Sequence, residues 1–240
     1  ITGDFGESYK YPGKTVIELL SPKLIVSAKL FLLSVLISTF FGIPLGFYAA
    51  LKQGTPTDPA IVSLTLILYA MPVFLTAPLL IIIFALELGW VPVSGWGGIF
   101  DKRAILPAIT VGLPGIAVIA RLMRASTLDV IGQEFITFAK AKGVDRFSIN
   151  FKHVGRNAIL PVVTVLGLSF SGMLGGALIV ELIFGIPGVA RFALDAIFSR
   201  DYPIIMALTL IGTASLVVAN LIVDILYVFL DPRIKYTNEN

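Results

Sequence analysis

Five long runs of apolar residues dominate the sequence. The hydrocarbon core of a bilayer takes about 20 helical residues to cross, and long runs with few charges are typical of membrane-spanning helices. The composition agrees, because 57% of the residues are hydrophobic and 14% are charged, with a mean hydropathy of +0.94. We predict an all-α integral membrane protein, since continuous runs favour helices over the short alternating segments of a β-barrel. The predicted spans are residues 24–50, 60–86, 104–120, 158–182 and 203–230.

Lysine and arginine residues outside the spans predict the orientation. If segment 121–157 is cytoplasmic, ten of these cations lie inside and seven outside, which is the bias expected of cytoplasmic loops. Residues 1–23 then form an external segment and residues 231–240 a cytoplasmic tail. An external start without a signal peptide predicts a further span before Ile1, and therefore six spans in the parent protein.

The sequence lacks the signatures of several kinds of site. With no cysteine and one histidine, His153, it offers no thiolate chemistry and no histidine cluster for a metal. Gly13-Lys14-Thr15 matches the end of a phosphate-binding loop, but the first glycine of that motif would fall at Ser8. The cations lie in loops between spans, which argues against nucleic-acid binding. We therefore predict no catalytic residue, no cofactor and no metal in this chain.

Two pairs of glycines lie four residues apart inside predicted spans. Gly42 and Gly46 flank a proline, and Gly172 and Gly176 lie in the fourth span. Small residues at this spacing let helix backbones approach closely. They also occur where a bent helix lines a substrate pathway. The sequence leaves both interpretations open.

Three polar residues lie in or near the last two spans. Asn220 and Asp224 are one turn apart on the last span, and Glu181 lies near the end of the fourth. An ionisable residue in a span is a functional candidate. Glu181 and Asp224 both lie near span ends, where water or arginine partners can reach them, so we favour structural pairing.

A charged segment, residues 134–157, interrupts the apolar runs with five Lys or Arg, two acidic residues and His153. Good helix formers precede Gly143, which predicts a short helix that ends there. Phe135, Phe138, Ala139 and Lys142 share one face of that helix. Such a helix can dock in a groove of a partner protein or rest on lipid headgroups, and the pattern does not decide between them.

Short motifs recur in order along nearly the whole chain. Ala139-x-Ala141-Lys142-Gly143 is followed by His153-x-x-Arg156-Asn157 and Pro161. The other motifs are Asp4-Phe5-Gly6 with Ser8, Leu88-Gly89-Trp90-Val91-Pro92-Val93-Ser94-Gly95, Arg121-Leu122-x-Arg124, Glu181-x-Ile183-Phe184-x-x-Pro187-Gly188, Arg200-Asp201-Tyr202-Pro203 and Asp231-Pro232-Arg233-Ile234. Together they resemble the permease subunits of bacterial ABC importers of the dipeptide/oligopeptide/nickel family.

The resemblance implies that residues 121–157, which include the charged segment, form a cytoplasmic coupling loop. Two ATP-binding subunits, which hold ATP and magnesium, would press on its helix and rock the spans between inward-open and outward-open states. This chain would not itself be an enzyme. The residues expected to couple to the ATPase are Glu134, Phe135, Phe138, Ala139, Ala141, Lys142, Gly143, Arg146, His153, Arg156 and Asn157.

On the external side, the resemblance implies a substrate-binding protein that delivers cargo to a cavity between this chain and a second permease subunit, most simply a heterodimer in the bacterial inner membrane. The cargo would be a di- or oligopeptide or a related small solute such as a nickel chelate, glutathione or an oligosaccharide. Residues expected at an external gate or docking surface are Glu181, Pro187, Gly188, Arg200, Asp201 and Tyr202.

The chain departs from the family pattern in places. The positions of the family's Glu-Ala-Ala hold Thr137, Phe138 and Ala139, and Ala190 stands where a glycine is common. His153 lies where the family has histidine whatever the cargo, so it does not argue for nickel. A self-sufficient secondary transporter and a membrane scaffold remain alternative functions.

Overall fold

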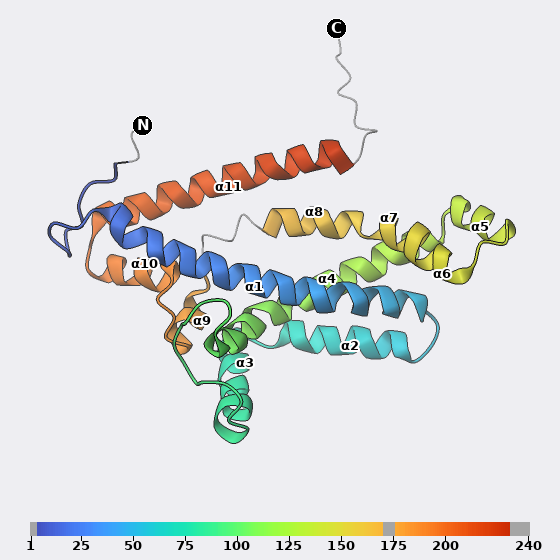
Figure 1. Cartoon of the computed structure of the whole chain (residues 1–240), viewed down its shortest axis with the longest axis horizontal. Coiled ribbons are helices and arrows are strands. Elements are labelled where there is room, and N and C mark those ends of the chain that lie inside the picture. Colours follow the sequence, from blue (N-terminus) through green and yellow to red (C-terminus); the bar gives the residue numbers. More distant parts are fainter. Residues whose placement is uncertain (1–3, 170–175, 231–240) are drawn as a thin grey trace, which may run out of the picture.

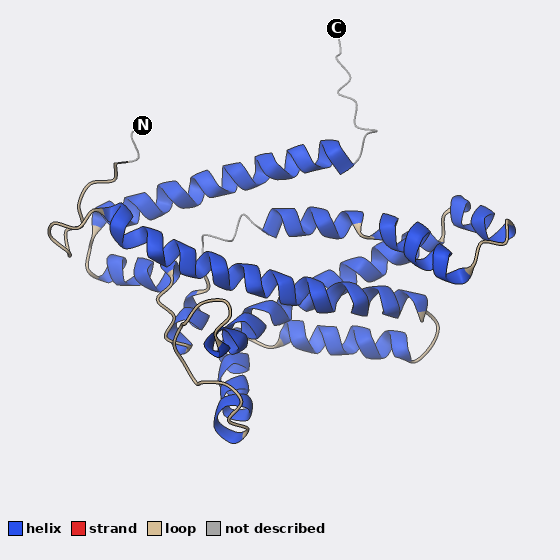
Figure 2. Cartoon of the chain, viewed as in Figure 1, coloured by secondary structure: helices blue, strands red, loops and turns tan. Residues whose placement is uncertain are grey.

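We analysed a computed structural model, which describes residues 4–169 and 176–230 and, within the last helix, leaves the side chains of residues 222–224 and 226–230 undescribed. Over these residues the chain is helical and has no strand, as Figure 2 shows, apart from one isolated bridge between Glu7 and Thr15. The prediction of an all-α fold is therefore confirmed.

The first helix, α1 (Val16–Leu51), is longer than the predicted span of residues 24–50. A capping box starts it, in which the Thr15 hydroxyl accepts from the Glu18 N–H and the Glu18 carboxylate accepts from the Thr15 N–H. Its 36 residues correspond to about 54 Å at 1.5 Å per residue, so α1 reaches well beyond a bilayer core.

The predicted span 60–86 is not one straight helix. It consists of α2 (Thr57–Ala70), α3 (Val73–Leu80) and the π-helix η1 (Ile81–Glu87), with a bend of 100° between α2 and α3. The break lies at Met71 and Pro72. Proline has no N–H to continue the ladder and disfavours helical geometry in the preceding residue, and Met71 accordingly has ψ of 119°. Pro78, by contrast, lies inside α3.

The third predicted span is longer than expected. A short 3₁₀ turn, η2 (Lys102–Ala104), leads into α4 (Ile105–Ile131), which continues eleven residues past the predicted end at residue 120 and carries Arg121 and Arg124. Beyond it come α5 (Glu134–Ala141), α6 (Arg146–Ser148), the π-helix η3 (Ile149–Gly155), α7 (Arg156–Ala158) and α8 (Leu160–Ser169).

The chain ends with α9 (Leu178–Ile183), α10 (Val189–Phe198) and α11 (Tyr202–Leu230). By length and composition, three helices of the described residues could cross a membrane, namely Val16–Leu51, Lys102–Ile131 and Tyr202–Leu221, and the bent pair α2 and α3–η1 would be a fourth. The predicted span 158–182 includes residues 170–175, with Gly172, which lie outside the described part. The five-span prediction is therefore not established.

In Figure 1, α1 and α4 lie side by side along the length of the molecule, with α5 and α6 at one end and α10 at the other. Small residues make the close contact between α1 and α4. The Ser38 hydroxyl donates to the Gly112 carbonyl across the two helices at 2.8 Å. A Cβ atom at Gly46 would lie 2.1 Å from the Ala120 carbonyl oxygen. This α1–α4 contact fixes how the two ends of the molecule are placed.

Candidate functional site

The helix α5 forms at the end of the molecule where α4 stops. Gly132 and Gln133 separate the two helices. The helix α5 ends as predicted at Gly143, which has φ of +78°. The Gly143 N–H donates to the Lys140 carbonyl at 3.0 Å and the Val144 N–H to the Ala139 carbonyl at 3.2 Å, which is a Schellman motif.

One face of α5 packs against the rest of the chain. Ile136 is fully buried and Ala139 is 9% exposed, and both belong to an apolar cluster with Phe47, Met123 and Val154. Ala139 was expected to approach a partner, whereas here it contacts its own chain. Ile136, which the sequence analysis missed, lies three residues before it and marks the same buried face.

The rest of the α5 surface is exposed, including Phe135, which borders the buried Ala139. Phe138 is 61% exposed and Phe135 is 40% exposed. The Lys142 ammonium lies 4.5 Å from the centroid of the Phe138 ring, in the range of a cation–π contact. An open hollow lies over this face, and its lining residues are Gly132, Glu134, Phe135, Thr137, Phe138 and Ala141. The arrangement offers an aromatic surface with a cation beside it.

A second pair of exposed aromatic rings lies after α5. Phe147 and Phe151 have ring centroids 4.6 Å apart and are 68% and 54% exposed. Phe151 also contacts Phe47 of α1, at 5.6 Å between centroids. The exposed aromatic surface at this end therefore extends from α5 to the segment that follows it.

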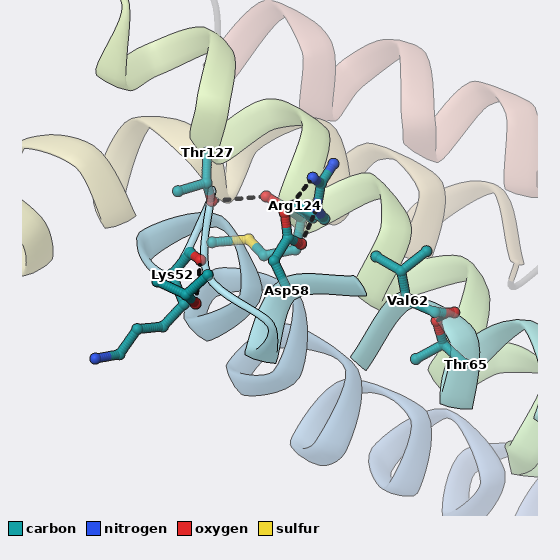
Figure 3. A network of polar contacts seen from close by, with 8 residues as sticks. Lys52, Asp58, Val62, Thr65, Arg124 and Thr127 are labelled. Atoms are coloured by element: carbon teal, nitrogen blue, oxygen red, sulfur yellow. Dashed lines mark hydrogen bonds and ion pairs between the residues drawn. The ribbon is translucent and has the colours of Figure 1, made fainter. Parts of the chain in front are cut away.

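A buried ion pair joins α2 to α4 near the same end, as Figure 3 shows. Arg124 donates from Nε to Asp58 Oδ1 at 2.6 Å and from Nη2 to Oδ2 at 2.7 Å. Asp58 is buried, and the Arg124 side chain keeps 28% of its surface. The sequence analysis found Arg124 in a motif but missed Asp58, which lies 66 residues earlier. An acidic residue in the first turn of an apolar run was the available signal.

At the opposite end, a clamp joins residues 8–10 to the start of α11. We use this name for Ser8, Tyr9, Lys10 and Asp201. The Ser8 hydroxyl donates to Asp201 Oδ2, and the Tyr9 and Lys10 N–H groups donate to the same carboxylate at 3.3 and 3.2 Å. Asp201 is fully buried. The clamp therefore fixes residues of the N-terminal segment against α11.

These features match a known family of membrane proteins. Residues 42–236 match the family model described as the inner membrane component of binding-protein-dependent transport systems. The chain belongs to this family. The oligopeptide transport permease OppB of Haemophilus influenzae is 38% identical over 98% of this chain and 76% of that protein. AppB of Bacillus subtilis, also an oligopeptide transport permease, is 38% identical over 98% of this chain and 77% of its own length.

A solved structure described as an amino acid ABC transporter with histidines has a similar fold. Its TM-score is 0.64 at 19% identity, and the match covers 87% of this chain and 92% of that one. This chain is thus a permease subunit of an ABC importer, a membrane protein that works with other subunits. The resemblance noted in the sequence is confirmed.

The remaining residues predicted to couple the permease to an ATPase lie around α5 and η3. Glu134, Ala141, Gly143, Arg146 and Arg156 are exposed. His153 is half-buried, and the Asn157 amide donates to its carbonyl oxygen at 2.6 Å. The structure thus gathers the predicted coupling residues at one end of the permease. Among them Ala139 is buried, His153 is half-buried and the others are exposed.

The residues predicted at an external gate divide into buried and exposed groups. Asp201 and Glu181 are both fully buried, and so is Gly188. Pro187, Arg200 and Tyr202 are exposed. Water or arginine partners were expected to reach Glu181, with structural pairing favoured; in the structure its carboxylate is buried and accepts hydrogen bonds from the Ser27 hydroxyl and the Arg191 N–H. The buried members cannot present their side chains to a docking protein in this conformation.

The structure also gives the positions of most residues predicted for helix packing or for a substrate pathway. Gly42 and Gly46 both pack against α4, since a Cβ atom on either would meet Ile119 or Ala120. Gly176 has φ of +68° and lies beside Glu181. Asn220 is exposed on α11. The Asp224 side chain and Gly172 lie outside the described part of the permease.

The clamp gives a prediction about pH. Burial acts to raise the pKa of the Asp201 carboxyl, but the hydrogen bonds from Ser8 and from the Lys10, Tyr9 and Ile204 N–H groups outweigh it and hold that pKa below its usual value of 3.8. A lowered pKa in the folded chain means that ionised Asp201 stabilises the clamp at any pH above about 4. The stabilisation is lost as the pH falls through the folded value.

We therefore expect the clamp to be intact between pH 5 and pH 8, and Ser8→Ala to loosen it at every pH in that range. Removing a hydrogen bond to a charged group costs about 1.5–3 kcal/mol, so amide hydrogen exchange of residues 9–11 should accelerate about tenfold or more. Ser199→Ala is the control, because the Ser199 hydroxyl bonds to the carbonyls of its own helix. Equal exchange in both variants would show that the clamp does not hold this segment.

Proposed function

We propose that this permease forms one half of a translocation pathway for oligopeptides in the bacterial inner membrane. A second permease subunit forms the other half, two cytoplasmic subunits bind and hydrolyse ATP with magnesium, and an external binding protein delivers the cargo. The oligopeptide assignment is supported by the relatives OppB and AppB, which are oligopeptide transport permeases and align with nearly the whole chain.

The observation that supports the coupling role is that one face of α5 is buried against the chain while the rest of the helix is exposed. Ile136 and Ala139 are buried in an apolar cluster that also contains residues of α1, α4 and η3, while Phe135, Phe138 and Lys142 are exposed. A helix anchored in this way can be pushed by a partner and can pass the displacement to α4, which ends two residues earlier. Aromatic residues are enriched at protein interfaces, which favours a protein groove over lipid headgroups.

Phe138→Ala tests this role. Because Phe138 is largely exposed, we expect the variant to fold and insert normally, while its affinity for the ATPase subunits falls roughly 30-fold, the equivalent of about 2 kcal/mol for an anchoring aromatic residue. The measurement is the amount of ATPase that co-purifies from native membranes and its titration against the purified permease. Phe100→Ala is the control, since Phe100 is 97% exposed in the loop before η2, away from α5.

Unchanged ATPase binding in Phe138→Ala would contradict the docking role of this face and favour a helix resting on lipid. Ala139→Glu is a less clean test, because a carboxylate there would enter the apolar cluster and unseat α5. Gly143→Asp adds no clash, as a Cβ atom has no neighbour within 4 Å, but it strains a position with positive φ.

The cargo requires a separate experiment. Purification of the full complex in mild detergent, followed by mass spectrometry, would identify the co-purifying subunits and any bound small molecule. A second permease, ATPase subunits and a peptide-loaded binding protein are the expected result. A bound nickel chelate, glutathione or oligosaccharide would redirect the substrate assignment, and a lone subunit would favour a self-sufficient transporter or a scaffold.

A further inference from the structure

A buried carboxylate joins three elements at the end of the permease opposite α5. Glu181 of α9 is fully buried. Its Oε1 accepts a hydrogen bond from the Ser27 hydroxyl of α1 at 2.7 Å, and its Oε2 accepts from the Arg191 N–H of α10 at 2.8 Å. In the described part of the chain no lysine, arginine or histidine side chain forms an ion pair with it. Its partners are neutral donors held in place by the fold.

Ser27 extends this contact to the first residue of α10. Its hydroxyl oxygen accepts from the Val189 N–H at 2.8 Å while the hydroxyl proton is donated to Glu181. Val189 and Arg191 are the first and third residues of α10. The first N–H groups of a helix have no intrahelical partner, and negative charge is favoured at that end. Glu181 and Ser27 together therefore tie the start of α10 to α1.

Glycine backbone encloses the carboxylate on two sides. A Cβ atom at Gly188 would lie 2.2 Å from Glu181 Cδ, and one at Gly176 would lie 2.8 Å from Oε1. Real Cβ atoms do not approach other atoms so closely, so both positions need glycine for the carboxylate to fit. The junction therefore depends on glycine at both positions to admit the Glu181 carboxylate.

A continuous packed path connects this junction with α5. Ser27 lies on α1, and α1 packs along α4 through Ser38, Gly42 and Gly46. Only two residues separate the end of α4 from the start of α5. Side chains with well-packed, discrete positions can carry coupling between distant sites. In Figure 1, α10 and α5 lie at opposite ends of the α1–α4 pair.

We propose that Glu181 is a positioning residue that makes α10 move as one body with α1, so that an event on the external side reaches α5 through α1 and α4. The proposal rests on the proposed function, because it assumes that a partner acts on α5. It assigns Glu181 and Ser27 a role in communication between the two sides of the permease. The exposed residues of the 184–203 segment, not Glu181 itself, would make the external contact.

The test uses the complete importer in lipid nanodiscs. ATPase activity is measured without and with the external binding protein saturated with tri-alanine, and the ratio of stimulated to basal activity is compared. We expect Ser27→Ala and Glu181→Gln each to assemble and to lower this ratio about tenfold, which is within the usual range of coupling between sites. Ser34→Ala is the matched control, since Ser34 is buried on the same helix and its hydroxyl bonds to the Leu30 carbonyl within α1.

The outcomes separate this role from a merely structural one. An assembled Ser27→Ala complex with the wild-type ratio would overturn the proposal, whatever Glu181→Gln does. An equal loss of basal and stimulated activity would also overturn it, because general damage lowers both. The wild-type complex is measured first, and if it lacks ATPase subunits or shows no stimulation, the proposed function fails before the role of Glu181 is tested.

Discussion

Gly46→Ala is expected to separate α1 from α4 and to destabilise the permease strongly. The added Cβ atom would lie 2.1 Å from the Ala120 carbonyl oxygen and 2.9 Å from the Ala120 carbonyl carbon. These are backbone atoms of a helix, so no side-chain rotation relieves the contact and the helices must move apart.

Two opposing effects decide the sign of this substitution. Alanine is favoured over glycine inside a helix by about 1 kcal/mol. Overpacking of a close contact typically costs about 1–3 kcal/mol and occasionally more, and a backbone obstacle places Gly46 at the upper end. We therefore expect a net loss of about 2 kcal/mol or more, seen as a melting temperature of the purified permease that is lower by roughly 5 °C.

Gly212→Ala is the matched control. Gly212 lies inside α11 and a Cβ atom there meets no atom within 4 Å, so only the helix propensity acts. This variant should melt at or slightly above the wild-type temperature. If Gly46→Ala were as stable as Gly212→Ala, the close contact between α1 and α4 would not exist in the membrane.

Asp58→Asn and Arg124→Gln are each expected to weaken the attachment of α2 to α4. The pair is bidentate and Asp58 is buried, so removing one charge leaves the other without compensation in a poorly solvated site. Breaking a buried pair costs about 3–5 kcal/mol. We expect the lower end of this range, because 28% of the Arg124 side chain remains exposed.

The double variant distinguishes the pair from two independent residues. Replacing both partners removes the uncompensated charge, so the double variant should be less destabilised than the sum of the single ones by about 1–3 kcal/mol. Melting temperatures of the four purified forms provide the measurement. Additive losses would show that Asp58 and Arg124 do not act on each other.

The exposed pair of Asp101 and Arg103 is the control for this experiment. Its charges lie 2.9 Å apart but the two residues are neighbours in one loop and both side chains are partly exposed. Ion pairs of this kind contribute little to stability. Asp101→Asn should therefore leave the melting temperature nearly unchanged, while Asp58→Asn lowers it.

The helical fold and the end of α5 could be predicted because their signals are local. Apolar runs predict membrane helices from composition alone, and Gly143 stops α5 through its own φ. Pro72 carried a local signal for the break after α2, because proline can interrupt a helix beyond its first turn, but Pro44 and Pro114 carry the same signal and lie inside the unbroken helices α1 and α4. Because the residues on both sides of Pro72 are apolar, the sequence predicted a single span there.

The buried face of α5 could not be predicted from its own residues. Phe135, Phe138 and Ala139 share a stripe by spacing, and the sequence does not say whether this stripe or its neighbour meets the chain. The answer depends on the apolar cluster in which Ile136 and Ala139 are buried, whose other members come from α1, α4 and η3. These members meet α5 only when the helices pack.

The buried hydrogen bonds and the ion pair show the same difference between local and distant signals. Glu181, Asp201 and Arg124 stood out in the sequence because charged residues are rare beside apolar runs. Their partners Ser27, Ser8 and Asp58 are separated from them by 154, 193 and 66 residues. Nothing in the sequence links Ser27, Ser8 or Asp58 to a partner at such a distance, so the sequence predicted candidate residues without their roles.

The sequence by itself determined that the chain is a helical membrane protein, that it resembles the importer permeases and that α5 ends at Gly143. Only the tertiary structure decided that Gly46 meets the backbone of α4, that Glu181 ties α10 to α1 and that Phe138 is free. The physical reason is range: composition, proline and glycine act on residues within a few positions, whereas burial and hydrogen bonding depend on groups that meet only when the helices pack.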